Sequence, residues 1–194
     1  MKRIAVFFHI AMIDGHEAIY REIKNVLDRC LLLYADVYTE NYCAADIFEF
    51  PTLDLISGFS RRNPGYDVLY LHTKGASHPG NSCVADWRRS MTHFMVEKHE
   101  ECRRKLKEYD LVGCNYRVYG GIPHWQGNFW WARSDYLSLL HNPRSLMYNK
   151  DICKDWKERH KCEAWVMSGN NPSWYQMYDH QCEPYKKNNP PPWE

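Results

Sequence analysis

The hydrophobic pattern of the chain opens with a strand followed by a helix. Residues 3–10 (RIAVFFHI) form a continuous apolar run rich in strand-forming residues, which is typical of a strand covered on both faces. After the turn at Asp14-Gly15, apolar residues recur at the spacing of one helical face, at Ala18, Ile19, Ile23, Val26, Leu27, Cys30 and Leu31. This order of elements is that of an α/β protein.

Similar patterns recur along the rest of the chain. We predict further strands over residues 36–42, 46–50, 67–73, 110–114 and 128–133. We predict further helices over residues 51–62, 84–106, 134–140 and 156–167, the third with Ser134 as its N-cap, and loops over residues 76–83 and 115–127. The alternation predicts an α/β fold, with a mixed, mostly parallel sheet flanked by helices in a single domain over residues 1–185. The proline-rich segment 186–194 is expected to be a tail or a linker to a further domain.

Composition and charge narrow the class of protein. The chain has 194 residues and a net charge of +1, which disfavours a broad nucleic-acid surface. No apolar stretch approaches the roughly 18 residues of a membrane span. The eight cysteines form no C-x-x-C pair, which disfavours a zinc ribbon. An even cysteine number also fits disulfides in a secreted protein, but the apolar N-terminal run lacks a cleavage site, so we favour reduced thiols and a cytoplasmic location.

Two predicted strands end in polar residues. His9 closes the first strand, and His72-Thr73-Lys74-Gly75 closes a later one. Ligands of open α/β sheets bind beyond the carboxyl ends of the strands. Lys74 offers a point charge to a phosphate, and Gly75 lets backbone N–H groups approach closely. The alternatives are a core histidine at position 9 and an ordinary turn at Lys74-Gly75.

Several motifs are absent from the chain. It contains no G-x-G-x-x-G after the first strand, no G-x-x-x-x-G-K-[ST], no G-x-S-x-G and no H-E-x-x-H. These absences disfavour dinucleotide oxidoreductases, P-loop enzymes, α/β-hydrolases and zinc metalloproteases.

Five segments occur in an order typical of one family. They are YLHTKGAS (70–77), DWRRSM (86–91), DLVGCNY (110–116), HWQGNFWWARSDYL (124–137) and RHKCEAW (159–165). Over roughly residues 3–170 the chain resembles the small GT-A-type glycosyltransferases found in polysaccharide-building gene clusters and in large DNA viruses. The resemblance implies a GT-A-like (Rossmann-type) fold. It also implies inverting transfer of a hexosyl or deoxyhexosyl group from a nucleotide sugar, such as a UDP-sugar, to a carbohydrate hydroxyl.

The resemblance also implies where the donor binds. Base and ribose would lie over the end of the first strand, and the diphosphate would lie over the later strand end. The donor-binding residues implied in this way are His9, Ile10, Ala11, His72, Thr73, Lys74, Gly75, Arg88 and Arg159. For Arg88 the alternative is a surface residue on a helix capped by Asp86.

The segment HWQGNFWWAR would form the wall against the sugars. The residues concerned are Trp125, Gln126, Gly127, Asn128 and Trp130. Gly127 would permit close approach, the two amides could bind hydroxyl groups, and a tryptophan could stack on a pyranose face. Because side chains alternate along a strand, Trp130 and Trp131 should point to opposite faces, so at most one can reach the site.

Glu163 would be the catalytic base by its place in the motif RHKCEAW. An inverting glycosyltransferase needs one carboxylate that takes the proton of the acceptor hydroxyl as this hydroxyl attacks the anomeric carbon. The alternative for Glu163 is a surface carboxylate on a helix.

The sequence departs from the family at one place. Most GT-A-type enzymes have an Asp-x-Asp pair that holds Mn²⁺ or Mg²⁺, whereas this chain has His72-Thr73-Lys74 there and no Asp-x-Asp anywhere. Two explanations stay open. Lys74 replaces the metal, or a divalent cation binds through residues drawn from His72, Asp86, Asp179 and His180. We expect no organic cofactor.

We therefore expect a glycosyltransferase whose partners are a nucleotide-sugar donor and a carbohydrate acceptor. The missing Asp-x-Asp motivates an alternative from another class, a carbohydrate- or nucleotide-binding module without catalysis.

Overall fold

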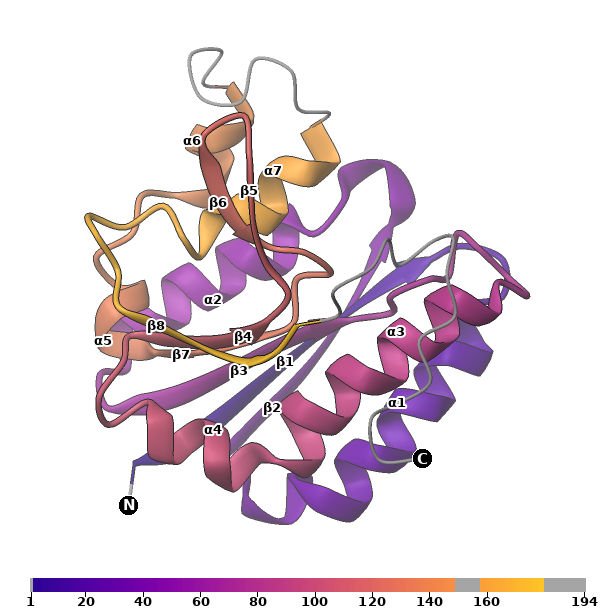
Figure 1. Cartoon of the computed structure of the whole chain (residues 1–194), viewed down its shortest axis with the longest axis horizontal. Coiled ribbons are helices and arrows are strands. Elements are labelled where there is room, and N and C mark those ends of the chain that lie inside the picture. Colours follow the sequence, from indigo (N-terminus) through magenta and orange to yellow (C-terminus); the bar gives the residue numbers. More distant parts are fainter. Residues whose placement is uncertain (1, 149–157, 180–194) are drawn as a thin grey trace.

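The fold is built on a six-stranded sheet with the strand order β2-β1-β3-β7-β4-β8. The computed structural model describes residues 2–148 and 158–179 (Figure 1). The strands of this sheet are β1 (Arg3–Met12), β2 (Val37–Ala44), β3 (Tyr66–His72), β4 (Leu111–Cys114), β7 (Trp130–Arg133) and β8 (Trp174–Tyr178). Strand β7 runs antiparallel to β3 and β4, and the other neighbours are parallel. The predicted mixed, mostly parallel sheet in a single α/β domain is confirmed.

Helices cover both faces of the sheet, which explains why the central strands β1 and β3 are largely apolar and buried. The helices are α1 (His16–Cys30), α2 (Phe50–Arg62), α3 (Ser82–Thr92), α4 (His99–Lys105), α5 (Ser134–Leu137), α6 (Pro143–Tyr148) and α7 (Glu158–Trp165). Figure 1 shows α1, α3 and α4 on one face and α2 with α5, α6 and α7 on the other. Successive residues of β1 alternate between these layers, so that Val6 and Phe8 pack in the first core and Ala5 and Phe7 in the second.

Strand β7 confirms that Trp130 and Trp131 point to opposite faces. Trp130 packs in the core under α2 and α7, and Trp131 packs in the core under α1 and α3. Both side chains are fully buried. The indole Nε1–H of Trp131 donates a hydrogen bond of 2.7 Å to the carbonyl of Met95. A central strand covered on both sides thus sends each tryptophan into a core.

The helix predicted over residues 84–106 is interrupted. It consists of α3, a π-helical turn (His93–Glu97) and α4. A π-turn inserts one residue and removes regular i→i−4 partners from its carbonyl groups. Two of these carbonyls have other donors: the Trp131 indole reaches Met95, and the Cys102 thiol reaches Phe94 at 3.2 Å. The sequence pattern does not show this interruption because the apolar stripe continues through it.

Two other predictions of secondary structure are wrong. Residues 46–50 are not a strand but contain a 3₁₀ turn (Ala45–Ile47) that leads into α2. Phe48 has a φ of 54°, which is incompatible with an extended strand. Ser134 does not cap a helix through residue 140, because α5 ends at Leu137 and the Ser134 hydroxyl accepts a hydrogen bond from the Tyr66 N–H at 2.9 Å.

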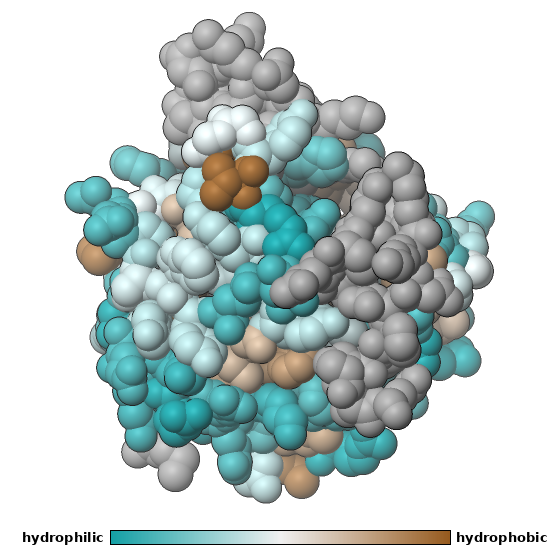
Figure 2. Space-filling view, viewed as in Figure 1, coloured by the Kyte–Doolittle hydropathy of each residue, from teal (hydrophilic) through white to brown (hydrophobic). Residues whose placement is uncertain are grey.

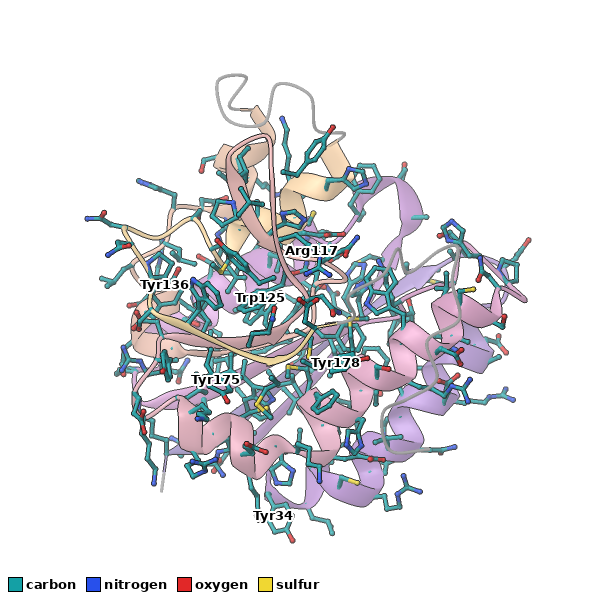
Figure 3. All side chains as sticks on the ribbon, in the orientation of Figure 1. Tyr34, Arg117, Trp125, Tyr136, Tyr175 and Tyr178 are labelled. Carbon is teal, nitrogen blue, oxygen red and sulfur yellow. The ribbon has the colours of Figure 1, made fainter. Side chains whose placement is uncertain are left out.

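The segment 115–127, predicted as a loop, contains a hairpin. Its strands are β5 (Tyr116–Tyr119) and β6 (Ile122–Trp125), joined at Gly120-Gly121. The hairpin packs beside α7, where Ile122 contacts Ala164 (Figure 1). Trp125 lies between the hairpin and the sheet (Figure 3), in the space that Gly113 leaves free. Helix α6 and strand β8 were not predicted, and α7 occupies only part of the predicted range 156–167, of which residues 156–157 lie outside the described residues.

The surface visible in Figure 2 is mainly hydrophilic, with small separate hydrophobic areas. Within residues 2–148 and 158–179, no helix has the length and apolar character needed to cross a membrane. In this part of the structure, the cysteines at positions 30, 43, 102, 114 and 162 carry free thiols.

The contact of Gly113 with Trp125 gives a test of the packing. A Cβ added at Gly113 would lie 2.6 Å from the Trp125 ring, so Gly113→Ala should lower the free energy of unfolding by about 1–3 kcal/mol. Gly58→Ala in α2 is the matched control, since its Cβ would meet only the Arg62 side chain at 3.5 Å; it should stabilise by about 0.5–1 kcal/mol. Urea unfolding measures both, and equal midpoints for the two variants would contradict this packing.

Candidate functional site

A pocket of about 240 Å³ lies at the carboxyl ends of β1 and β3. Its polar and charged lining comes from separate parts of the chain, namely His9, Glu49, His72, Thr73, Lys74, Ser77, His78, His160 and Glu163. The sheet order explains the place of the pocket. From β1 the chain passes to β2 on one side and then crosses to β3 on the other, so the strand order reverses between β1 and β3. The crevice at such a reversal is where open α/β sheets bind ligands.

The end of β1 contributes His9 and Ala11, but not Ile10, to the lining of the pocket. The His9 ring is buried, and its Nδ1 lies 2.7 Å from the Thr52 hydroxyl. Burial, with the nearby His72, lowers the pKa of His9 to about 4 against the opposing effect of Glu49, so the ring is neutral at neutral pH. Ala11 lines the pocket, whereas Ile10 is fully buried in the core on the α1 side because neighbouring residues of a strand face opposite ways.

The end of β3 supplies His72. Its Nε2 lies 2.9 Å from the Gly127 carbonyl, and because a carbonyl only accepts hydrogen bonds, Nε2 carries the hydrogen. Burial, followed by the charge of Lys74, lowers the pKa of His72 to about 4. Neutral His72 therefore presents an unprotonated Nδ1 on the other side of its ring.

The turn after β3 brings Thr73, Lys74 and Gly75 to the pocket, as predicted. The Thr73 N–H donates to the His9 carbonyl at 3.1 Å, which extends the pairing of the two strands. Gly75 has a φ of 90°, and a Cβ there would lie 2.6 Å from Val84. The position thus requires glycine. The Lys74 ammonium lies 4.2 Å from the centre of the Trp87 ring, in a cation–π contact.

Arg88 supports this turn from outside the pocket. Its guanidinium forms an ion pair with Glu22 at 2.7 Å and donates to the Lys74 carbonyl at 3.0 Å. Arg88 therefore braces the turn and does not line the pocket as the donor-binding prediction required. The side chain of Arg159, the other predicted phosphate ligand, lies outside the described residues.

Glu49 is the site residue that the sequence analysis missed. It precedes α2, and its Oε2 accepts a hydrogen bond of 2.6 Å from the Tyr70 hydroxyl and another from the Asn128 side-chain amide. Its Oε1 lies 3.9 Å from Nδ1 of His72. Residues 46–50 alternate like a strand, and nothing in that pattern marks Glu49 as a pocket residue. The only local signal is a glutamate flanked by two phenylalanines.

Glu163 lies on α7 and reaches the pocket from the side opposite the sheet, next to His160. Glu163 and His72 line the same pocket, and the charge of Glu163 raises the pKa of His72 against the stronger effects of burial and Lys74. The structure thus brings the predicted base together with the predicted phosphate-binding turn.

The predicted sugar wall supports the pocket from behind. Trp125 and Trp130 are fully buried in the hydrophobic core, so the prediction that they present a face to a sugar is not supported. The side chain of Asn128 is buried too and holds Glu49, while the Gly127 carbonyl holds His72. Gln126 is half-buried and lies outside the pocket lining.

The four metal-binding candidates are not assembled into one site. Asp86 forms an ion pair with Arg89, and Asp179 forms one of 2.7 Å with Arg117 (Figure 3 labels Arg117). His180 lies outside the described residues, and among the described ones no three His, Cys, Asp or Glu side chains are grouped as metal ligands would be.

Comparison with known proteins defines the family. The chain matches the model of a family described as a domain of unknown function (DUF8361) over residues 29–173, and it belongs to this family. The matched range includes Glu49, His72, Lys74 and Glu163, whereas His9 precedes it. No curated protein and no solved structure matches the chain.

The two neutral histidines give the site a pH signature. Their pKa values of about 4 lie below the unfolded value of 6.5, so below pH 6.5 the unfolded chain binds more protons than the folded one. Stability should therefore be complete above pH 6.5 and fall with decreasing pH, by about 1.4 kcal/mol per pH unit for each histidine. Glu49, Lys74 and Glu163 are the charged groups that face the rings.

Urea unfolding between pH 5 and pH 6.5 measures this slope. His72→Gln keeps a donor for the Gly127 carbonyl. This substitution should lower by about one the difference in the number of protons bound by the unfolded and folded states. His141→Gln, at an exposed position, is the control and should leave the slope unchanged. An unchanged slope in His72→Gln would contradict the neutral, buried state of this ring.

Proposed function

We propose that this protein is a glycosyltransferase that transfers a sugar from a nucleotide sugar, such as a UDP-sugar, to a carbohydrate hydroxyl. One observation carries the proposal: a pocket at the reversal of strand order is lined both by Lys74, from the turn after β3, and by Glu163, from α7. A cation suits the departing diphosphate, and a carboxylate suits the attacking hydroxyl. The resemblance to GT-A-type enzymes supports the same assignment.

The proposed reaction is a single displacement with inversion. Glu163 takes the proton of the acceptor hydroxyl while the hydroxyl oxygen forms a bond to the anomeric carbon. The bond between that carbon and the diphosphate oxygen breaks, and the nucleoside diphosphate leaves with the electron pair. Lys74 stabilises the negative charge that develops on the leaving group. The turn at Gly75 and the Arg88 brace hold Lys74 in place for this role.

The charge balance of the pocket bears on the use of a metal. Its described lining carries one lysine, two carboxylates (Glu49 and Glu163) and four histidines, of which His9 and His72 are neutral. A diphosphate adds further negative charge, so Lys74 alone does not neutralise the filled site. A divalent cation that arrives with the nucleotide would supply the missing charge, with the phosphate oxygens as part of its ligand shell.

Thermal unfolding with UDP, GDP and dTDP, each with and without Mn²⁺, tests donor binding. At a nucleotide concentration of about 100 times Kd, the matching nucleotide should stabilise by roughly 2.7 kcal/mol and raise Tm by about 5–10 °C. Lys74→Met should abolish most of this shift. Lys107→Met, at an exposed site, should keep it. A shift that persists in Lys74→Met would remove Lys74 from the phosphate site, and a shift that needs Mn²⁺ would show that the metal binds with the nucleotide.

Substitution of the base tests catalysis. With a matched donor and acceptor, Glu163→Gln should lower the transfer rate at least about 100-fold with little change in donor affinity, because the amide cannot accept the hydroxyl proton. Glu101→Gln on the exposed face of α4 is the matched control. Near-normal transfer by Glu163→Gln would contradict the assignment of the base. Nucleotide-sugar binding without any turnover by the wild-type chain would favour the alternative, a binding module that the missing Asp-x-Asp motivates.

A further inference from the structure

We propose that Glu49 and His72 together form a two-acceptor site that binds the vicinal diol of a ribose or a pyranose. The inference rests on the proposed function for the class of ligand. The geometry of the two acceptors is the evidence that the recognised group is a diol. No feature of the sequence assigned a role to Glu49.

The Glu49 carboxylate is fixed by one of its two oxygens. Oε2 accepts hydrogen bonds from the hydroxyl of Tyr70 and the amide of Asn128, and both of these residues are fully buried. Asn128 is itself held by the Trp130 indole, which donates to its Oδ1 at 2.9 Å. With Oε2 occupied and its donors rigid, Oε1 is left directed toward His72 at the pocket lining. A carboxylate locked in this way is preorganised for a ligand.

His72 provides the second acceptor. Its Nε2–H is taken by the Gly127 carbonyl, which leaves the lone pair of Nδ1 toward Glu49. The Nδ1–Oε1 distance of 3.9 Å is too long for a direct hydrogen bond. Two hydrogen-bond acceptors that face each other cannot bond to each other, so each needs a donor from the pocket, either solvent or a ligand.

A vicinal diol matches this need. A single hydroxyl brings one hydrogen and can satisfy one acceptor, whereas two adjacent hydroxyls bring two hydrogens, one for Oε1 and one for Nδ1. Each bond would have the usual length of about 2.8 Å. A divalent cation is less suited, since it requires more ligands than these two, and no third His, Cys, Asp or Glu completes such a group in the described part of the chain.

The backbone conformation next to Glu49 also indicates a ligand-binding position. The preceding residue, Phe48, has φ 54° and ψ −147°, a region that bulky residues almost never adopt and that costs about 1–3 kcal/mol. This conformation turns the chain so that Phe48 and Glu49 both line the pocket. Strain that persists beside a fixed carboxylate is typical of a ligand-binding position.

Isothermal titration of the whole chain with UDP, 2′-deoxy-UDP and 2′,3′-dideoxy-UDP, with and without Mn²⁺, tests a ribose diol. Methyl glucopyranoside against methyl 2-deoxyglucopyranoside tests a pyranose diol. Whether the diol belongs to the ribose or to the pyranose, the wild-type chain and Glu101→Gln should bind the ligand with the complete diol at least tenfold more tightly than its deoxygenated analogue. In Glu49→Gln this ratio should fall to near one.

Glu49→Gln also has a signature that a purely structural residue would not give. With its oxygen still accepting from Tyr70 and Asn128, the new amide N–H₂ would face Nδ1 of His72 and present a donor where the carboxylate presents an acceptor. Glu49→Gln should therefore keep or raise the unfolding midpoint in urea while it loses recognition of the diol. A lowered midpoint together with unchanged recognition of the diol would overturn the proposal.

The remaining outcomes separate this inference from the proposed function. Equal binding of UDP and dideoxy-UDP to the wild-type chain, with no pyranoside bound, overturns the diol site and leaves donor binding intact. Diol-dependent binding of the pyranoside without any nucleotide supports the diol site and overturns the proposed donor. Binding of Mn²⁺ alone that is lost in Glu49→Gln overturns the diol site in favour of a cation. If the wild-type chain binds none of these probes, both are overturned.

Discussion

The architecture of the pocket depends on the satisfaction of one partly buried carboxylate. A charged group removed from water destabilises the fold unless hydrogen bonds replace its hydration. Glu49 receives them from Tyr70 on β3 and from Asn128 just before β7. These bonds join the loop before α2 to the carboxyl end of one strand and to the start of another. The same edge is closed by the bond from His72 to the Gly127 carbonyl, so the residues around the pocket are held as one unit.

This constraint also explains the unusual backbone around the site. Phe48, Gly127 and Asn128 all have positive φ values. A Cβ at Gly127 would lie 2.6 Å from the sulfur of Met91, so the close approach of this segment to α3 needs glycine. Asparagine tolerates the left-handed region better than most residues, which suits position 128. The strained positions gather on either side of Glu49 and His72, as is typical of ligand-binding sites.

The sequence predicts well those features that depend on local periodicity. The apolar run of β1, the amphipathic spacing of α1 and the polar ending of β3 all lead to the correct elements, and the rule for open sheets places the pocket at the ends of β1 and β3. Features that depend on long-range contacts are missed. The Glu49 carboxylate is held by hydrogen bonds from Tyr70 and Asn128, which lie 21 and 79 residues away along the chain. The local pattern DIFEF, by contrast, resembles that of a strand. The tryptophans of β7 suggest a sugar platform by composition, but the strand is central and covered on both faces, so they pack in the two cores.

The pocket at the carboxyl ends of β1 and β3 is proposed to bind a nucleotide sugar. The most direct measurement is a crystal structure of the chain with UDP, with Mn²⁺ present. We expect the diphosphate within hydrogen-bonding distance of Lys74 and the nucleoside over the end of β1, with Glu49 and His72 among the residues that contact the nucleotide. A nucleotide bound away from this pocket, for example on the β5–β6 hairpin, would contradict the account.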